Sequence, residues 1–437
     1  MKKYRSGCNF QSAILFFCGL VVFLLANARI ASAQHAAVPS WKQPQDPNKT
    51  EAFWGAHQGG VVTPPQHHIY FAVFDLTTDK REDLVRLMKA WTIAAERMSR
   101  GETAQPLSDG LKLAVTPGQQ KKKIGEEGEG ESLDAATMVA DTGETTGMSP
   151  ARLTIAFGFG AGLFEKDGKD RFALAAQRPQ ALVEIPRFNG DQITPEHSGG
   201  DLVVQACAED PQVAFHAVRQ LARMAEGVAK IHWVQTGYRP ATGERHLLGF
   251  SNGIGNPSVD NEDAMQRSVW VGDEGPAWMR GGTYMVVRRI RFAIEHWDHM
   301  SQAYQESALG RYKHPGVKSS DEKVSDTISD EGEMTHMQIV TPKSTSMLRR
   351  SYSYNNGVDF ISERWPPWRQ GLEYDAGMLF ICYQKDPRTA FVEMYDKMSK
   401  YDIKLNQFWT HEASGLFAYP PAAREGEYVG QALLESH

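Results

Sequence analysis

Residues 68–75 read HIYFAVFD, and this run of aromatic and branched side chains predicts the first β-strand of the fold. A helix is predicted to follow the strand and to end at Gly101. Asp79 with Glu82 has the form of a capping box at the start of that helix. Apolar residues then recur at helical spacing, at Leu84, Leu87, Met88, Trp91 and Ala95. A strand followed by an amphipathic helix is therefore the first unit that the sequence predicts.

The rest of the first half extends this unit into a familiar order of elements. Strands are predicted over residues 153–158, 201–208 and 231–236, and a helix over residues 212–224. That helix is predicted to turn an apolar set inward: Val213, Phe215, Ala217, Val218 and Leu221. The resulting order, β-α-β-β-α-β, is that of a ferredoxin-like domain.

The second half repeats the order of elements but not the residues. Its predicted strands are residues 283–294, 347–354, 378–384 and 416–419, and its predicted helices are residues 300–309 and 388–398. The last helix carries Phe391, Met394, Tyr395 and Met398 on one face. The sequence therefore predicts an α+β protein of two tandem ferredoxin-like domains, over residues 34–240 and 241–437, with antiparallel sheets and peripheral helices.

The first 33 residues have the composition of a signal peptide. A basic start precedes an almost purely apolar stretch over residues 13–26, which is shorter than the about 20 apolar residues that span a bilayer. The sequence Ala-Ser-Ala at residues 31–33 supplies a small-residue cleavage site. We expect residues 1–33 to be removed and the protein to be periplasmic or secreted. An uncleaved N-terminal anchor is the alternative.

The charge of the chain argues against polyanionic partners. The full chain has a formal net charge of −6. The predicted leader holds four basic residues and no acidic one, so the mature chain would carry −10. An excess of negative charge repels phosphate backbones, and we expect no nucleic-acid partner.

Two cysteines lie beyond the predicted leader. Cys207 and Cys382 each lie inside an apolar, strand-like run. Their separation fits neither a zinc site nor a disulfide framework. A role as small buried apolar residues is expected of both, and a single disulfide between them is the alternative outside the cytoplasm.

Two polar stretches fall outside the pattern of strands and helices. Residues 119–131 read QQKKKIGEEGEGE and continue into a Thr- and Gly-rich segment to residue 148, and residues 318–333 form a similar acidic stretch. Such runs are typical of solvated loops. A regulatory metal site in either stretch is the alternative hypothesis.

Taken one at a time, the candidate site residues are weak signals. The cluster GFSNGIGNP at residues 249–257 allows close approach of a ligand to the backbone, but Gly-Asn-Pro clusters are usually turns. His336 begins an apolar run, and Arg349 follows 13 residues later in a predicted strand. A buried arginine is costly unless it meets an anion or a ligand. These residues indicate a site without naming its chemistry.

Taken together, the motifs resemble those of the dye-decolourising peroxidase family. The resemblance is nearest to the exported branch that accompanies bacterial iron uptake, sometimes called deferrochelatase/peroxidase. It extends from residue 53 nearly to the C-terminus. It is carried by residues 53–60 (FWGAHQGG), 63–66 (TPPQ), 249–257, 276–278 (PAW), 281–297, 310–313 (GRYK), 348–354 and 378–384. The family fold, a pair of ferredoxin-like domains, agrees with the predicted order of elements.

The resemblance implies one haem b per chain and a role for each matching residue. His336 would be the proximal ligand of the iron, and Arg349 would lie over the open, distal face. Arg311 would pair with a haem propionate, for which a guanidinium is well shaped. The remaining residues expected around the haem are Gly253, Ile254, Gly255, Thr341, Pro342, Lys343 and, in the apolar part of the pocket, Phe380.

One position departs from the family. The family motif Gly-x-x-Asp-Gly supplies an aspartate that moves the proton of hydrogen peroxide, and this chain has Asn252 there. An amide has no proton to exchange at neutral pH, but it still orients peroxide or water by hydrogen bonding. Catalysis would then depend on Arg349, which stabilises negative charge on the departing oxygen, with Asn252 in an orienting role.

The resemblance therefore predicts an exported peroxidase that oxidises a small organic donor or ferrous iron with hydrogen peroxide. Association with an iron-uptake system and a homo-oligomeric state are further expectations. The alternative is a haem-binding or iron-handling protein of the deferrochelatase type with weak or no peroxidase turnover. A structural module without haem is the third hypothesis. The sequence does not identify the carboxylate that should accept a hydrogen bond from the second nitrogen of His336.

Overall fold

The structure is a computed structural model that describes residues 45–106, 140–251, 255–314, 335–340, 347–362 and 370–436. Its first half contains β1 (His68–Leu76), α2 (Arg81–Ser99), β2 (Thr154–Gly160), β3 (Leu202–Ala208), α6 (Pro211–Met224) and β4 (Ala229–Tyr238). This is the predicted β-α-β-β-α-β order. The predicted signal peptide lies outside the described residues. Among the described helices, none is long and apolar enough to cross a membrane.

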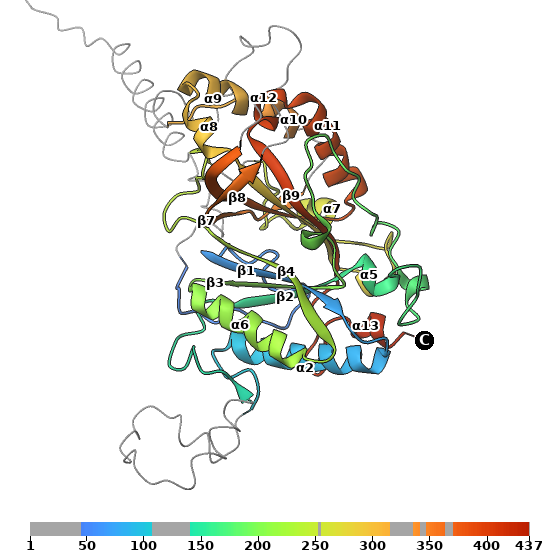
Figure 1. Cartoon of the computed structure of the whole chain (residues 1–437). Helices are drawn as coiled ribbons and strands as arrows, with labels where there is room; N and C mark the ends of the chain where they lie inside the picture. Colours follow the sequence, from blue (N-terminus) through green and yellow to red (C-terminus); the bar gives the residue numbers. More distant parts are fainter. Residues whose placement is uncertain are drawn as a thin grey trace, which may run out of the picture. The chain divides into compact units, whose positions relative to one another are not determined.

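The first-half strands form an antiparallel sheet in the order β4-β1-β3-β2, here called the first sheet. Helices α2 and α6 lie side by side on one face of this sheet (Figure 1). Trp91 of α2 packs against Phe74 and Phe157 at ring-centroid distances of 5.2 Å and 5.7 Å. Its indole N–H donates to the Leu221 carbonyl of α6 over 2.9 Å. The helical face of the first sheet is therefore a closed apolar core.

The second half repeats the same topology. Its strands are β5 (Thr283–Phe292), β6 (Leu348–Arg349), β7 (Tyr352–Ser362), β8 (Gln370–Gln384) and β9 (Trp409–Tyr419). The main strands pair antiparallel in the order β9-β5-β8-β7, here called the second sheet, and β6 adds to β8. Its helices are α8 (Ile294–Asp298), α9 (Gln302–Leu309), α10 (His336–Val340), α11 (Glu393–Tyr401) and α12 (Ile403–Asn406). The predicted fold class, tandem ferredoxin-like units, is confirmed; the exact domain boundaries stay a prediction.

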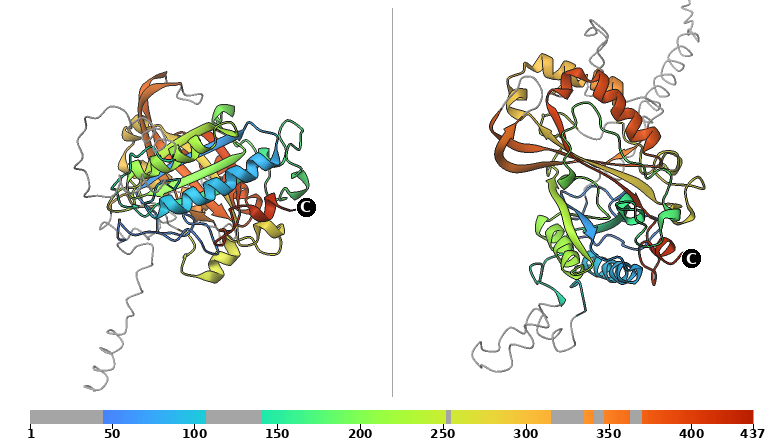
Figure 2. Two further views of the ribbon diagram at one scale, coloured as in Figure 1. Left: turned by 90° about the horizontal axis from the view of Figure 1, so that it is seen from below. Right: turned by 45° about the vertical axis from the view of Figure 1, so that its right-hand side comes forward.

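The two sheets join at both edges and enclose a second core. β2 pairs with β9 through Phe159↔Ala418 and Gly160↔Phe417, and β4 pairs with β7 at Tyr238↔Ser353. The side chains between the sheets include Phe71, Trp233, Ile381, Tyr383 and Phe417, all buried. Because the inner faces close on each other, the outer faces carry the helices. On the second sheet this outer face is covered by α9, α10 and α11 (Figures 1 and 2).

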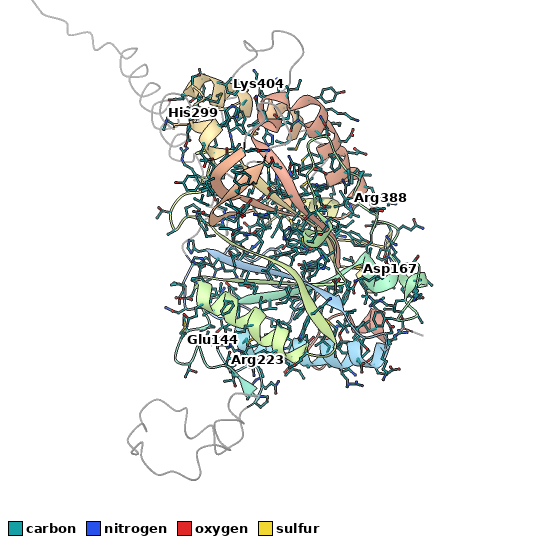
Figure 3. All side chains as sticks on the ribbon, in the orientation of Figure 1. Glu144, Asp167, Arg223, His299, Arg388 and Lys404 are labelled. Carbon is teal, nitrogen blue, oxygen red and sulfur yellow. The ribbon has the colours of Figure 1, made fainter. Side chains whose placement is uncertain are left out.

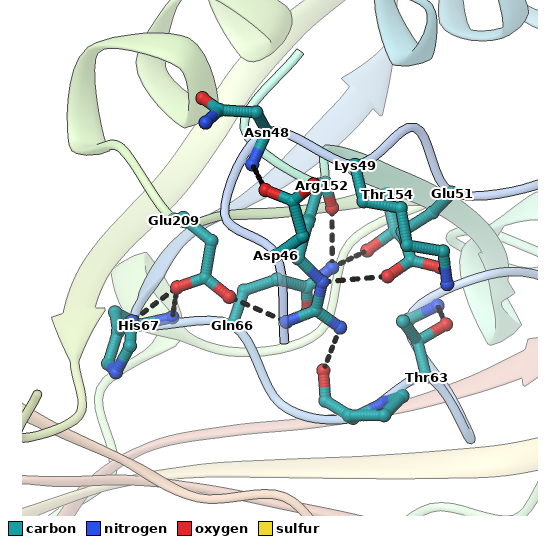
Figure 4. Close-up of polar contacts among 12 residues, drawn as sticks. Asp46, Asn48, Lys49, Glu51, Thr63, Gln66, His67, Arg152, Thr154 and Glu209 are labelled. Carbon is teal, nitrogen blue, oxygen red and sulfur yellow. Dashed lines mark hydrogen bonds and ion pairs between the residues drawn. The ribbon is translucent and has the colours of Figure 1, made fainter. Parts of the chain in front are cut away.

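The segment before β1 is fastened by one buried arginine. Arg152, 1% exposed, donates from Nε to Glu51 over 2.8 Å and from Nη1 to Glu209 over 2.6 Å. Its Nη2 donates to the Pro64 carbonyl over 3.0 Å (Figure 4). These contacts tie residues 45–66 to the edge of the first sheet. This extended segment is thereby held in one position although it contains no helix or strand.

Two local predictions are wrong. The helix α2 begins after Lys80, which forms no side-chain cap. Thr78 replaces the expected capping box, because its hydroxyl accepts the Lys80 N–H over 3.1 Å and donates to Asp83 over 2.7 Å. Phe215 of α6 is 41% exposed and packs beside Tyr70. It lies off the inner face, where the polar His216 is buried instead.

Other local predictions are confirmed, and some concern residues outside the described ones. Cys207 and Cys382 are buried and free, as their apolar surroundings predicted. The four-residue apolar face of the last predicted helix is buried, although that helix begins with a π-helical turn over Arg388–Val392. Residues 119–131 and 318–333 lie outside the described residues. The remaining short helices are α5 (Ala161–Phe164), α7 (Glu262–Ser268) and α13 (Gln431–Leu434).

Candidate functional site

His336 is the first residue of α10, and its imidazole is held by a buried carboxylate. Nδ1 lies 2.7 Å from Oδ2 of Asp402, which is 1% exposed and occupies the junction between α11 and α12. A carboxylate accepts a hydrogen bond from Nδ1–H, so the lone pair of Nε2 is left for a metal ion. The Trp409 ring packs edge-on at 5.2 Å from the imidazole. The pair has the geometry of a histidine oriented to bind a metal.

Sequence reasoning missed Asp402. Its neighbours along the chain, Tyr401 and Ile403, belong to no recognisable motif. It meets His336 only because the end of α11 lies beside α10 in the fold. No local pattern could have singled it out.

Arg349 reaches the site from the second sheet. It is the last residue of β6 and lies opposite Cys382 of β8. The side-chain oxygen of Asn256 accepts from the backbone N–H of Arg349 over 3.0 Å and from its Nε over 3.3 Å. The Asn256 amide donates to the Arg349 carbonyl over 2.8 Å. Asn256 is therefore a positioning residue that sequence reasoning treated as part of a turn.

Position 255, beside Arg349, requires glycine. Its φ is +81°, and a Cβ atom there would lie 3.1 Å from Nη2 of Arg349. A side chain would be strained by the backbone conformation and would press on the guanidinium. The structure thus places Gly255 in close packing with Arg349, while its predicted place at the edge of the haem stays a prediction. Asn252, Gly253, Ile254, Thr341, Pro342 and Lys343 lie outside the described residues.

Phe380 faces the same side of the second sheet as Arg349. It lies two residues before Cys382 on β8, so the two side chains share a face, and Cys382 is directly opposite Arg349. Phe380 is buried and packs near the rings of Phe391 and Tyr395 at 6.2 Å and 6.3 Å. An apolar wall therefore lies next to the arginine.

Arg311 follows the left-handed Gly310 that ends α9. It is 9% exposed, and its Nε has no hydrogen-bond partner among the described residues. Burial, and then the cations Arg349 and Arg245, lower the pKa of Arg311 to about 10. The guanidinium lies 5.8 Å from the Phe250 ring. A buried cation with cationic neighbours is stabilised when an anion binds.

Lys313 and His246 complete the surroundings. Lys313 also lies over the Phe250 ring at 5.8 Å, and its Nζ donates to Gln305 over 2.7 Å. Burial, followed by the charges of Arg311, His336 and Arg245, lowers the pKa of His246 to about 3, so this imidazole is neutral. The site thus combines a histidine oriented to bind a metal, from the helices, with cations from the loops and the sheet. It suits a flat ligand that carries a metal and anionic groups.

A second cluster of titratable residues bears on the alternative hypothesis of a metal site in the polar stretch that continues to residue 148. His216 of α6 lies 3.3 Å from Asp141 and 3.2 Å from Glu144 through its two nitrogens, and Figure 3 labels Glu144 beside α6. Burial alone would lower the pKa of His216, but the two carboxylates raise it overall. The three residues are close enough to hold a metal ion. Both nitrogens already have carboxylate partners, so a proton satisfies this cluster.

The comparisons with known proteins agree with one another. The family models described as Dyp-type peroxidase, N-terminal and C-terminal, match residues 58–239 and 243–424. A deferrochelatase of Escherichia coli K12 is 29% identical over 437 residues, with 94% of each chain covered. The structure of ferric DtpA from Streptomyces lividans is 33% identical, with a TM-score of 0.72 over 92% of this chain and 100% of that one. A DyP-type peroxidase from Cellulomonas bogoriensis is 30% identical, with a TM-score of 0.70 over 90% and 100% of the two chains.

Proposed function

Because the chain belongs to the Dyp-type peroxidase family of haem-dependent enzymes, we propose that it reduces hydrogen peroxide at the expense of a small organic donor or ferrous iron. The observation that carries the proposal is the pairing of His336 with Asp402, and the anchoring of Arg349 by Asn256 supports it. The identity of the electron donor and the effect of Asn252 on turnover are proposals. Peroxidase chemistry and haem follow from the family.

The described residues fit haem. His336 offers Nε2 to an iron because Nδ1 is engaged by Asp402. Arg311 is buried with an Nε that has no partner among the described residues, and its electrostatic neighbours are cations. Haem carries an iron and two carboxylates, which match these two features. When bound, it supplies the redox-active iron at which peroxide is reduced.

Each residue of the chain then has a defined task. Asp402 accepts a hydrogen bond from Nδ1–H of His336, orients the ring and increases its basicity. Arg349 stays cationic and stabilises the negative charge that develops on the oxygen that leaves. Asn256 fixes the backbone and Nε of Arg349, so the guanidinium is oriented before peroxide arrives.

Asn252 is the reason to propose slower chemistry. An amide orients peroxide through hydrogen bonds but moves no proton at neutral pH. The proton would therefore travel through water, while Arg349 supplies the electrostatic part. General acid–base groups contribute about 10²–10⁴-fold, so the loss of one slows turnover without abolishing it.

The second candidate is an iron-handling protein of the deferrochelatase type, with weak or no peroxidase turnover. The name of the Escherichia coli relative favours it, and so does Asn252. Stopped-flow spectra of the haem-loaded protein with one equivalent of hydrogen peroxide separate the two candidates. We expect a rapid spectral change and oxidation of an added donor. Retained haem with neither response would favour the iron-handling function.

We also propose that the protein is exported, through cleavage after residue 33, and that it works beside an iron-uptake system. The basic start, apolar stretch and Ala-Ser-Ala site support export. Homo-oligomer formation is a further proposal. N-terminal sequencing of protein from cell fractions tests export: a mature chain that begins at Gln34 is expected, and an intact Met1 in the cytoplasm would contradict it.

A further inference from the structure

His246 lies in a tight turn that fixes its ring. Arg245 and Ser251 form an isolated β-bridge, and the N–H of His246 donates to the Phe250 carbonyl over 2.9 Å. The ring packs near Phe250 and Phe292, with centroid distances of 6.4 Å and 6.2 Å. The residue is 6% exposed. Its orientation is therefore set by the backbone and by two aromatic neighbours.

The hydrogen bonds of His246 place its proton. Nδ1 accepts the backbone N–H of Leu248 over 3.3 Å. Because a neutral imidazole carries one N–H, the proton is assigned to Nε2. Among the described residues, Nε2–H has no acceptor. The residue as a whole is 6% exposed, so little water reaches this donor, and an acceptor is expected from a bound group.

The surroundings identify the chemistry of that acceptor. The charges that act most on His246 are those of Arg311, His336 and Arg245. Arg311 has an Nε without a partner among the described residues. The His246 ring and the Arg311 guanidinium both lie near the Phe250 ring, at 6.4 Å and 5.8 Å from its centroid. Two donors without acceptors among the described residues therefore lie in a cationic part of the site, near His336. A carboxylate would satisfy both.

We propose that Nε2–H of His246 donates to a carboxylate of the bound haem, beside Arg311. The inference rests on haem as the cofactor and adds a residue that binds it. His246 would hold the haem without touching the iron, and it would act as a neutral donor that adds no further positive charge to the arginines. A lysine or arginine there would increase their mutual repulsion.

Haem release measures this contact directly. Transfer of haem to an excess of apomyoglobin should be roughly tenfold faster from His246→Leu than from the parent, as expected for one hydrogen bond to a charged group. His246→Gln keeps a donor and should lie between the two. A near-UV circular dichroism spectrum checks that both variants fold. The parent rate in His246→Leu would overturn the proposal.

A second arm of the experiment uses haem dimethyl ester, in which both carboxylates lose their charge. The ratio between His246→Leu and the parent should shrink towards one with the ester. An equal ratio for both haems would also overturn the proposal, because the effect would then come from packing. Failure of the haem assignment itself looks different: the parent would then take up neither haem nor its ester.

A different observation concerns the outer part of the β7–β8 hairpin. Val358, Phe360, Leu372 and Tyr374 are 58%, 63%, 77% and 48% exposed, and together they are called the arm face. Val358 is directly opposite Tyr374, and Phe360 is opposite Leu372. Opposed residues and residues two apart share one side of a ribbon, so all four point the same way. Figure 2 shows this hairpin extending beyond the rest of the second sheet.

The arm is held firmly although no described residue covers its face. Asp375 pairs with Arg289 and accepts from Asn356 over 2.8 Å. The backbone N–H of Tyr374 donates to Glu295 over 2.8 Å. These contacts fix the base of the hairpin. An anchored apolar face on the order of 400 Å² is at the size that marks an interaction site.

The geometry points to a second copy of the chain as the partner of the arm face, with two arms packed face to face about a two-fold axis. An apolar ribbon is complementary to itself in such a pair. The acidic pair Asp359↔Glu373 on the reverse side and the negative net charge disfavour an anionic membrane. About 800 Å² buried in total is less than the 1,200–2,000 Å² of stable complexes. The dimer is therefore expected to be reversible.

Sedimentation velocity across roughly 1–100 µM protein tests this dimer. The parent should shift from monomer to dimer, and the double variant Phe360→Ser with Leu372→Ser should stay monomeric. Ile93→Ser is the matched control, because Ile93 is an exposed apolar residue, 56% exposed, on α2. A parent that is monomeric throughout would overturn the proposal. So would a double variant that dimerises like the control, or an arm that binds neutral vesicles instead.

Discussion

The two sheets share one strand order, 4-1-3-2 within each half, but their helical faces differ in kind. On the first sheet, Trp91 fills the space between Phe74 and Phe157, and its only polar atom has a partner. On the second sheet, the corresponding face carries Arg349 and the fully buried Arg288. The same topology therefore builds a closed core in one half and a binding site in the other.

The charged face of the second sheet needs partners from elsewhere. Arg288 donates to Asp191 over 2.9 Å, and Asp191 comes from the long segment between β2 and β3. Its guanidinium also lies 5.4 Å from the rings of Phe188 and Tyr395. For Arg288 the protein itself supplies the anion. For Arg311 no described residue supplies one, and there the cofactor is expected to supply it. The two halves thus differ in what fills the helical face of the sheet. Apolar side chains fill it in the first half, whereas the second half is expected to need a bound group as well.

The largest expected effect is the loss of haem from a variant of the second half. His336→Ala should abolish or greatly weaken haem retention, because no other described residue offers an iron ligand beside Asp402. The Soret band and the haem content of the purified protein measure this. The fold should persist, since His336 lies on a short helix of five residues. An unchanged Soret band would refute the assignment.

Trp91→Ala is the counterpart in the first half. Removal of this fully buried side chain should cost about 3–5 kcal/mol of unfolding free energy through lost burial and a cavity. Haem content per folded molecule should stay at the parent level. Urea unfolding and pyridine haemochrome analysis give the two quantities. A variant that keeps its stability but loses haem would mean that the halves do not divide core and site as described.

Next in size is Arg349→Leu. The variant should retain haem and lose roughly 10²–10³-fold in the rate of peroxide cleavage, since one preorganised electrostatic group is removed. Stopped-flow mixing with hydrogen peroxide gives the rate. Arg350→Leu is no substitute as a control, because Arg350 is buried against Gln66 and Thr63. Arg280→Leu is suitable, as its ion pair with Asp273 is exposed. Equal rates for Arg349→Leu and the parent would mean that another group stabilises the charge on the departing oxygen.

Asp402→Asn should have a smaller effect on the same site. The amide still orients His336 but no longer makes it more basic, so haem affinity should fall about 10–100-fold. The reduction potential of the iron should rise, because a less basic ligand stabilises the ferric state less. Spectroelectrochemistry measures the potential. A merely structural role for Asp402 would leave the potential unchanged while stability falls.

These residues also mark where sequence reasoning succeeds and fails. The order of strands and helices could be predicted because hydrophobic periodicity is local, as in residues 68–75. His336, Arg311 and Arg349 could be assigned only through whole-chain resemblance. Asp402 and Asn256 could not, because their roles depend on contacts across 66 and 93 residues.

The failures elsewhere have equally physical causes. The hydroxyl of Thr78 outcompetes the expected cap. Phe215 is exposed because the buried His216 takes the inner position on α6, where the carboxylates of Asp141 and Glu144 stabilise it. The predicted strands over residues 347–354 and 378–384 stop short of the arm, because Asn355 to Val358 contains a bulge and turn-forming residues. The failure on α6 comes from tertiary partners. The failures at α2 and in the arm come from local side-chain and backbone features.

The smallest expected effect concerns Asn252, which would sharpen the contrast by showing how far the site depends on a proton carrier. Asn252→Asp is nearly isosteric and adds a group that exchanges a proton. We expect faster reaction with peroxide, by about tenfold rather than the full 10²–10⁴ of acid–base catalysis, since Arg349 already supplies the electrostatic part. Burial would raise the pKa of the new carboxyl group and Arg349 would lower it. Whichever prevails, the gain should appear on one side of that pKa, whereas the parent rate should lack this titration. Second-order rates across a pH series for both proteins decide the matter. A rate that is unchanged or lower at every pH would mean that the pocket is built around the amide, and the iron-handling function would then be the better proposal.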